Sequence, residues 1–284
     1  MLKIVDSILT EVARKDDSIR VIVADVGNFR KFSFEYPGQF LNVGVAELNS
    51  IGVAAGLAEA GKRVFVYSVA GFILHRAFEQ IKFELGYWNQ SVTILGTGVG
   101  WRYHQIGRGH HCPEDFALMG LIPNMERHAP MTVATLEKLL RDESDYPRYI
   151  RLPENICSED QLCLSKSEVD ILIITLGEVL LECQEAVASL NGINIAVIPI
   201  EHLNLTIVSN AVKKIKYKKI MVFEEHVSQG GLGEILFKEQ IKVDHYQCLP
   251  IVFEHIAKTK SDLKKLYGFD VASISSSILK LNQE

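Results

Sequence analysis

Short apolar runs alternate with helical patterns along this chain, and this alternation constrains the fold more than any other feature. Runs of this length, rich in Val, Ile and Leu, are typical of strands buried in a parallel sheet. Helices between such strands cover both faces of the sheet. In the first half we predict strands at residues 20–25, 63–67, 91–96 and 148–152, and helices at 7–14, 47–60, 76–88, 113–120 and 132–142.

The second half repeats the alternation after a polar stretch near residues 153–165 that breaks the periodicity. With 284 residues, of which 48% are hydrophobic and 23% charged, the chain is long enough for two sizeable cores. We therefore predict an α/β protein with two three-layer α/β/α domains, residues 1–155 and 165–284, whose sheets are mostly parallel. The second should contain strands at 169–176, 195–200 and 219–224, and helices at 179–190, 208–215 and from 230–233 toward 242.

Charge and composition exclude several classes of partner. The formal net charge is -5, and the nearest approach to a basic cluster is residues 213–219, which argues against nucleic acid or an anionic membrane surface. No apolar run approaches the roughly 20 residues that span a bilayer, and residues 1–15 have the pattern of an amphipathic helix rather than a signal peptide. The five cysteines form no CxxC pair, so we expect reduced thiols and a cytoplasmic protein.

One acidic residue, Glu47, stands inside the small-residue, apolar stretch N-V-G-V-A-E-L-N-S-I-G-V-A-A-G at residues 42–56. A buried carboxylate without a partner is costly, so its presence asks for a chemical reason. The simpler alternative is an acid at a helix start, where it satisfies free backbone N–H groups or the helix dipole.

Further blocks follow in a fixed order. Residues 64–80 end in R-A-F-E-Q, and residues 107–119 read G-R-G-H-H-C-P-E-D-F-A-L-M. Next come P-N-M at 123–125 with A-P at 129–130, Y-I-R at 149–151, and V-F-E-E-H-V-S-Q-G-G-L-G at 222–233. Together with the Glu47 stretch, these blocks resemble the pyrimidine-binding and C-terminal domains of transketolases and related thiamine diphosphate enzymes.

The resemblance implies that Glu47 bonds N1′ of the cofactor's aminopyrimidine ring and drives its activation. The activity implied is transfer of a two-carbon ketol unit from a ketose to an aldose, with thiamine diphosphate and Mg²⁺ as cofactors. The family's aromatic positions fall on Ala70 and Ile73, with Phe72 and Phe78 close by. The cofactor-binding candidates are Glu47, Tyr67, Phe72, Ile73 and Arg76.

On the substrate side, His110 falls on the family's sugar-facing histidine and is the second catalytic candidate. The same register puts Ile106 and Gly109 where the family has an aspartate and a threonine, so two polar groups of the block are missing. Metal binding by the nearby histidines and Cys112 is disfavoured, because no spacing repeats a known tetrahedral site. The substrate-binding candidates are His104, Arg108, His111 and Arg151.

The acceptor side departs from the family as well. Pro153 and Glu154 stand where many transketolases place an arginine for the sugar phosphate. Arginine suits bidentate phosphate contact and glutamate repels phosphate. We expect an acceptor other than an ordinary sugar phosphate, such as a larger or nucleotide-linked sugar.

The chain contains no G-D-G motif, with which such enzymes hold the diphosphate and Mg²⁺. Its glycine clusters at 96–100 and 230–233 also lack the G-x-G-x-x-G form of a dinucleotide site. The resemblance therefore implies half of a split transketolase, whose partner is an N-terminal subunit that carries G-D-G, in an α2β2 heterotetramer. The second domain is expected to have a structural or assembly role.

Two alternatives remain open. Within the cofactor class, the chain could be the β subunit of a 2-oxoacid dehydrogenase or resemble a 1-deoxyxylulose 5-phosphate synthase. Outside catalysis, it could be a scaffold subunit that kept the fold and lost turnover.

Overall fold

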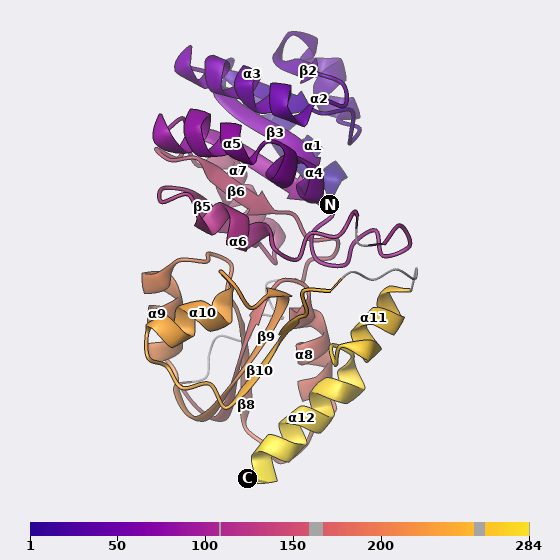
Figure 1. Ribbon diagram of the computed structural model, residues 1–284, viewed down its shortest axis with the longest axis vertical. Helices are drawn as coiled ribbons and strands as arrows, with labels where there is room; N and C mark the ends of the chain where they lie inside the picture. Colours follow the sequence, from indigo (N-terminus) through magenta and orange to yellow (C-terminus); the bar gives the residue numbers. More distant parts are fainter. Residues whose placement is uncertain (108, 159–166, 253–258, 284) are drawn as a thin grey trace.

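The computed structural model, which describes residues 1–107, 109–158, 167–252 and 259–283, contains two parallel sheets. Every strand pair in both sheets is parallel. Figure 1 shows one sheet with its helices in the upper half of the molecule and the other in the lower half. This confirms the predicted α/β class, while the domain limits 1–155 and 165–284 stay a prediction.

The first sheet has six strands in the order β2-β1-β3-β4-β6-β5. Neighbouring residues of a strand point to opposite faces, so Val66 joins one core and Phe65 the other. Its strands are β1 (Ile19–Val23), β2 (Phe40–Asn42), β3 (Arg63–Val69), β4 (Val92–Thr97), β5 (Glu126–His128) and β6 (Arg148–Arg151).

Helices cover both faces of this sheet, which gives the predicted three layers. One core joins the sheet to α1 (Leu2–Ala13), α2 (Arg30–Glu35) and α7 (Val133–Arg141). The opposite core joins it to α3 (Glu47–Glu59), α4 (Ala70–Arg76), α6 (Asp115–Gly120) and the helical segment that follows α4. A short 3₁₀ turn, η1 (Pro37–Gln39), leads into β2.

The helix predicted at residues 76–88 is wrong in detail. The structure ends α4 at Arg76, where the helical backbone is interrupted at Ala77 (φ -108°, ψ 19°). The chain then continues as α5 (Phe78–Gln80) and the π-helix η2 (Ile81–Tyr87). Hydrophobic periodicity could not show this, because an apolar stripe survives a break of one residue.

The second sheet has the strand order β10-β9-β7-β8. In Figure 1, α9 and α10 lie on one side of it, and α8 and α12 lie on the other. Its strands are β7 (Glu168–Leu176), β8 (Ile195–Pro199), β9 (Lys216–Val227) and β10 (His245–Leu249). The helices are α8 (Val179–Ala188), α9 (Leu205–Lys213), α10 (Leu232–Lys238), α11 (Lys260–Leu266) and α12 (Val271–Gln283).

Several elements were not predicted, namely β2, α2, η1, α4, β5 and everything after residue 242. Both β2 and β5 are edge strands of three residues, too short to show alternation. Among the described residues, no helix is long and apolar enough to cross a membrane.

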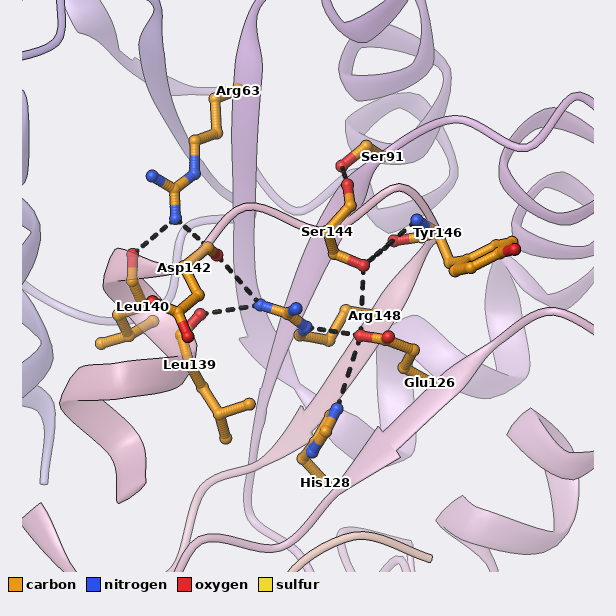
Figure 2. Close-up of polar contacts among 10 residues, drawn as sticks. All are labelled: Arg63, Ser91, Glu126, His128, Leu139, Leu140, Asp142, Ser144, Tyr146 and Arg148. Atoms are coloured by element: carbon orange, nitrogen blue, oxygen red, sulfur yellow. Dashed lines mark hydrogen bonds and ion pairs between the residues drawn. The ribbon is translucent and has the colours of Figure 1, made fainter. Parts of the chain in front are cut away.

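Two arginines hold the end of α7 against the first sheet (Figure 2). Arg148 Nη1 donates to Leu139 O at 2.8 Å and to Asp142 O at 3.3 Å. Arg63 Nη2 donates to Leu140 O at 2.8 Å and to Asp142 O at 2.9 Å. Cations at a helix C-terminus satisfy its free carbonyl groups and complement the helix dipole.

Glu126 of β5 supplies the counter-charge in this cluster. Its Oε2 accepts from Arg148 Nε at 2.8 Å and lies 3.5 Å from His128 Nε2. The nearby His128 ring, together with the Arg148 guanidinium group, lowers the pKa of Glu126 to about 2. A carboxyl group whose pKa is depressed on folding stabilises the fold above its ordinary pKa, and this stability is lost as the pH falls toward the folded value.

We predict that Glu126→Gln lowers the free energy of unfolding at pH 7 by roughly 1–3 kcal/mol, because a charge-assisted bond is lost. The difference from the parent should shrink as the pH falls from about 4.5 toward about 2. Thermal unfolding across this pH range measures it. The control is Glu137→Gln, which removes an exposed partner of Arg141 and should cost little at any pH. A difference that stays constant with pH would contradict the assignment.

Candidate active site

Glu47 begins α3, as predicted, after a turn at Gly44 whose φ of 75° suits glycine. We call the six-stranded sheet with its helices the first unit and the four-stranded sheet with its helices the second unit. The turn points the first residue of α3 into the first unit, so that the Glu47 side chain is only 5% exposed. The carboxylate has a partner, because its Oε1 accepts from Arg76 Nη1 at 2.9 Å. This ion pair offsets the cost of burying the charge.

Arg76 reaches Glu47 from the last turn of α4. Its guanidinium carbon lies 4.2 Å from the centroid of the Phe72 ring, one helical turn earlier, which is cation–π distance. The Phe72 ring also meets the His110 ring edge-on, with centroids 5.0 Å apart. The structure thus brings together Glu47, Phe72, Arg76 and His110, which come from three separate sequence blocks.

Two other cofactor candidates lie elsewhere. Tyr67 packs edge-on against Phe29, with ring centroids 5.2 Å apart, in the core on the opposite face of the sheet. Burial raises the pKa of its hydroxyl group. Ile73 is fully buried in the core between α3 and α4. Roles for these two residues in cofactor binding stay proposals.

We define the histidine loop as residues 98–107 and 109–112. It carries the catalytic candidate His110 and two of the substrate candidates, His104 and His111. His104 and His110 are half-buried and His111 is buried. Arg108 lies outside the described residues. The loop therefore keeps two imidazole groups within reach of solvent, and the His110 ring lies beside Phe72.

The cluster of Glu47, Phe72, Arg76 and His110 contains the kinds of group that suit an aminopyrimidine ring. A buried carboxyl group can exchange a proton with a ring nitrogen, and a half-buried phenyl ring can stack on the heterocycle. Glu47 and Phe72 supply these two groups, and the Arg76 guanidinium group contacts both of them. Among the described residues, no group of three or more His, Cys, Asp or Glu side chains is placed to hold a metal ion.

A hollow of about 390 Å³ adjoins the cluster, lined by Gly71, His75 and Glu114 among others. His75 Nε2 lies 3.2 Å from Glu114 Oε1, and its Nδ1 is 2.9 Å from Gly71 O. No role was predicted for His75 or Glu114. The sequence feature that could have indicated His75 is the pair His75-Arg76, which ends the otherwise apolar helix α4.

Arg151, a predicted substrate-binding residue, is buried at the junction of the two sheets, and its role in substrate binding stays a prediction. Its side chain is 3% exposed, Nε lies 2.9 Å from Asp115 Oδ2, and Nη2 donates to Glu225 O at 2.9 Å. The Tyr149 hydroxyl group donates to the same Asp115 oxygen at 2.7 Å. Although burial acts in the opposite direction, Asp115 raises the pKa of Arg151. The guanidinium group thus joins the two sheets.

The E-E-H block at the end of β9 makes the other half of this junction. Glu224 stays within the second unit, where Oε2 accepts from Leu232 N at 2.6 Å, and burial raises its pKa to about 7. His226 Nε2 accepts from Ala117 N of α6 at 3.3 Å, while Nδ1 lies 2.6 Å from Val227 O. Burial lowers the pKa of His226 to about 4, so the ring is neutral at pH 7 and can accept this bond.

Comparison with known proteins follows the same division. The family described as the transketolase pyrimidine-binding domain matches residues 1–158. A subunit of the apulose-4-phosphate transketolase of Phocaeicola vulgatus is 33% identical over 251 residues, which cover 80% of this chain and 79% of that protein. A putative transketolase C-terminal section of Methanocaldococcus jannaschii is 31% identical in an alignment that covers 96% of this chain and 93% of the relative.

A solved structure extends the likeness to the arrangement of both units. The structure described as a split gene transketolase, inactive beta4 tetramer, superposes with a TM-score of 0.79 at 26% identity. The match covers 98% of this chain and 96% of that one. Both sheets and the junction between them therefore have a counterpart in one solved chain.

We predict that Arg151→Met lowers the free energy of unfolding by about 3–5 kcal/mol, because it leaves the Asp115 carboxylate buried without its cation. Urea unfolding measures the loss. The matched control is Arg141→Met, which removes exposed pairs with Glu11 and Glu137 and should cost less than about 1 kcal/mol. Equal losses in the two variants would mean that the junction does not depend on the buried pair.

Proposed function

This chain belongs to the transketolase family, and we propose that it is the C-terminal subunit of a split, thiamine diphosphate-dependent transketolase. In this proposal the enzyme transfers a two-carbon ketol unit from a ketose to an aldose. The observation that carries it is the buried Glu47 carboxylate, which the Arg76 guanidinium group links to the Phe72 ring. These are the two groups that an aminopyrimidine ring needs, one for its nitrogen and one for its face.

The chain's own residues would divide the work as follows. When bound, thiamine diphosphate supplies the carbon nucleophile that cleaves the C2–C3 bond of the ketose and passes the two-carbon unit on. Glu47 would hold a proton at the pyrimidine nitrogen, and Phe72 would stack on the ring. Arg76, half-exposed at the end of α4, would give up Glu47 to the cofactor while it stays over Phe72. His110 and His104 would exchange protons with the sugar oxygens, and His111 would border their pocket.

The partner in this proposal is an N-terminal subunit with the G-D-G motif, which would hold the diphosphate and most of the Mg²⁺ contacts. Support comes from the lack of that motif in this chain and from relatives named as one subunit of a transketolase and as a transketolase C-terminal section. We further propose an α2β2 assembly, and a cytoplasmic location in keeping with the four described cysteines, none of which is in a disulfide.

The central test is Glu47→Gln, assayed with the chain reconstituted with its G-D-G partner. Loss of the carboxylic acid should reduce kcat by at least about 10²-fold, the contribution of a positioned proton donor. Calorimetry with thiamine diphosphate and Mg²⁺, on each chain alone and on the pair, measures the cofactor affinity separately. We expect tight binding by the pair only.

The matched control is Glu59→Gln, at the exposed far end of the same helix. This variant should keep normal turnover and cofactor affinity. Normal activity of Glu47→Gln would sink the assignment. Cofactor binding without turnover by the parent pair would favour the scaffold alternative, and release of CO₂ from pyruvate would favour the 2-oxoacid dehydrogenase alternative.

We also propose that the acceptor is not an ordinary sugar phosphate. At the position of the family's phosphate arginine, Glu154 Oε2 lies 3.2 Å from Lys260 Nζ of α11. Burial alone would raise the pKa of Glu154, but Lys260 holds it below its usual value, so the carboxylate is charged. A phosphate group in this position would meet a negative charge, and it would compete for a lysine that Glu178 also pairs with at 3.1 Å.

We expect the assembled pair to turn over ribose 5-phosphate with a kcat/KM no higher than that for unphosphorylated or nucleotide-linked aldoses. Coupled assays with a common ketol donor, β-hydroxypyruvate, measure these ratios. Glu154→Arg should raise kcat/KM for ribose 5-phosphate, since arginine binds phosphate in a bidentate fashion. A strong preference of the parent pair for ribose 5-phosphate would contradict the proposal.

A further inference from the structure

We propose that the second unit positions the histidine loop through two contacts, Trp101 in its hydrophobic core and Glu225 against the backbone of Gly100. This gives the second unit a part in substrate recognition, beyond the structural or assembly role predicted from the sequence. The inference rests on the proposed function, because it takes His104 and His110 to meet the substrate.

Trp101 belongs by sequence to the first unit but packs within the second. Its side chain is 3% exposed and lies in the core formed by β7, α8 and α12. The indole ring stacks on Tyr267, with centroids 5.7 Å apart and planes 22° apart. It also meets Phe269 edge-on at 5.4 Å. Burial of an indole between two aromatic rings is among the strongest single apolar contacts that a loop can make.

Glu225 adds a polar contact next to this aromatic one. Its Oε1 accepts a hydrogen bond from Trp101 N at 3.3 Å. The carboxylate lies so close to Gly100 that a Cβ atom there would collide with Oε1. Gly100 also has a φ of 56°, a conformation that glycine adopts without strain. The loop can therefore approach Glu225 only because residue 100 has no side chain.

The position set at Gly100 is transmitted to the other end of the loop. Gly100 N donates to Cys112 O at 3.2 Å, and Cys112 N donates to Gly100 O at 3.4 Å. This pair of bonds ties the two ends of the histidine loop together, two residues after His110. The His110 ring in turn contacts Phe72 at 5.0 Å. A shift of Trp101 would therefore move His110 relative to Phe72 and Glu47.

Figure 1 shows the loop at the junction of the two units, beside the upper end of α11. The neighbouring Glu225 carbonyl accepts from Arg151, so the same short stretch of β9 holds both β6 and the loop. Misplacement of a substrate-orienting group by about 1 Å can cost up to 10²-fold in rate. Trp101 and Glu225 are thus positioning residues, since neither is proposed to touch the substrate.

The test uses fluorescence and kinetics on the same variants. The chain has two tryptophans, and Trp88 is 68% exposed, so Trp88→Phe leaves Trp101 as the sole reporter. In this background we expect Trp101 to be shielded from iodide. Phe269→Leu should increase iodide quenching at least twofold. In the complex with the partner subunit, it should raise KM for β-hydroxypyruvate roughly tenfold, with unchanged calorimetric affinity for thiamine diphosphate.

The matched control is Phe223→Leu, because Phe223 is fully buried in the same core and its ring contact is with His245. Both substitutions should lower the Tm by a similar amount, while only Phe269→Leu should change quenching and KM. A second pair, Trp101→Phe and Trp101→Leu, separates aromatic anchoring from bulk. The phenylalanine variant should keep a KM within about threefold of the parent, since an aromatic ring can still stack on Tyr267.

The inference is overturned if Trp101 is quenched as freely as Trp88, or if Phe269→Leu exposes Trp101 and leaves KM equal to that of Phe223→Leu. A parent pair that neither binds thiamine diphosphate nor turns over a ketol donor would count against the proposed function instead. The quenching result, measured on the chain itself, would still decide whether the second unit anchors the loop.

Discussion

The arrangement of the two units depends on the buried Arg151 guanidinium group, which pairs with Asp115 in its own unit and donates to the Glu225 carbonyl group of the other. Both side chains are removed from water, which is costly unless every charge and lone pair finds a partner. The Tyr149 hydroxyl group and the Glu225 carbonyl group supply two of those partners at 2.7 and 2.9 Å, while Asp115 Oδ1 is buried without a hydrogen bond from any described residue. Because β6 and α6 hold the ion pair while β9 supplies the Glu225 carbonyl group, a rotation of one sheet against the other would leave Arg151 Nη2 buried without its acceptor.

The candidate site lies in the first unit but inherits its geometry from this junction. α6 begins at Asp115, directly after the segment that runs from His110 to Glu114. The E-E-H block secures the opposite side, with one residue for each task. Glu224 holds the start of α10, Glu225 meets the histidine loop, and His226 accepts a bond from α6. The second unit thus contributes to the site without bringing a side chain of its own to the cluster around Glu47.

The ion pair with Arg76 stabilises the buried Glu47 carboxylate within this chain. Burial of a carboxylate without a counter-charge is costly. Arg76 offsets this cost with a bond of 2.9 Å, while the Phe72 ring supports its guanidinium group. The arginine remains half-exposed, so it can leave the carboxylate without disturbing the core.

The sequence by itself determined the alternation of strands and helices, the start of α3 at Glu47, and the lack of a diphosphate-binding motif. These properties are local, since periodicity and motif order are written in neighbouring residues. Only the tertiary structure decided that Arg76 pairs with Glu47, that Arg151 joins the two sheets, and that Trp101 packs in the core of the other unit. Each of these contacts joins residues far apart in the chain, and which distant partner a buried charge or ring finds depends on how the layers pack. The three-residue strands β2 and β5 were not predicted, because they are too short to show an alternating pattern. They form only by pairing with the neighbouring strands.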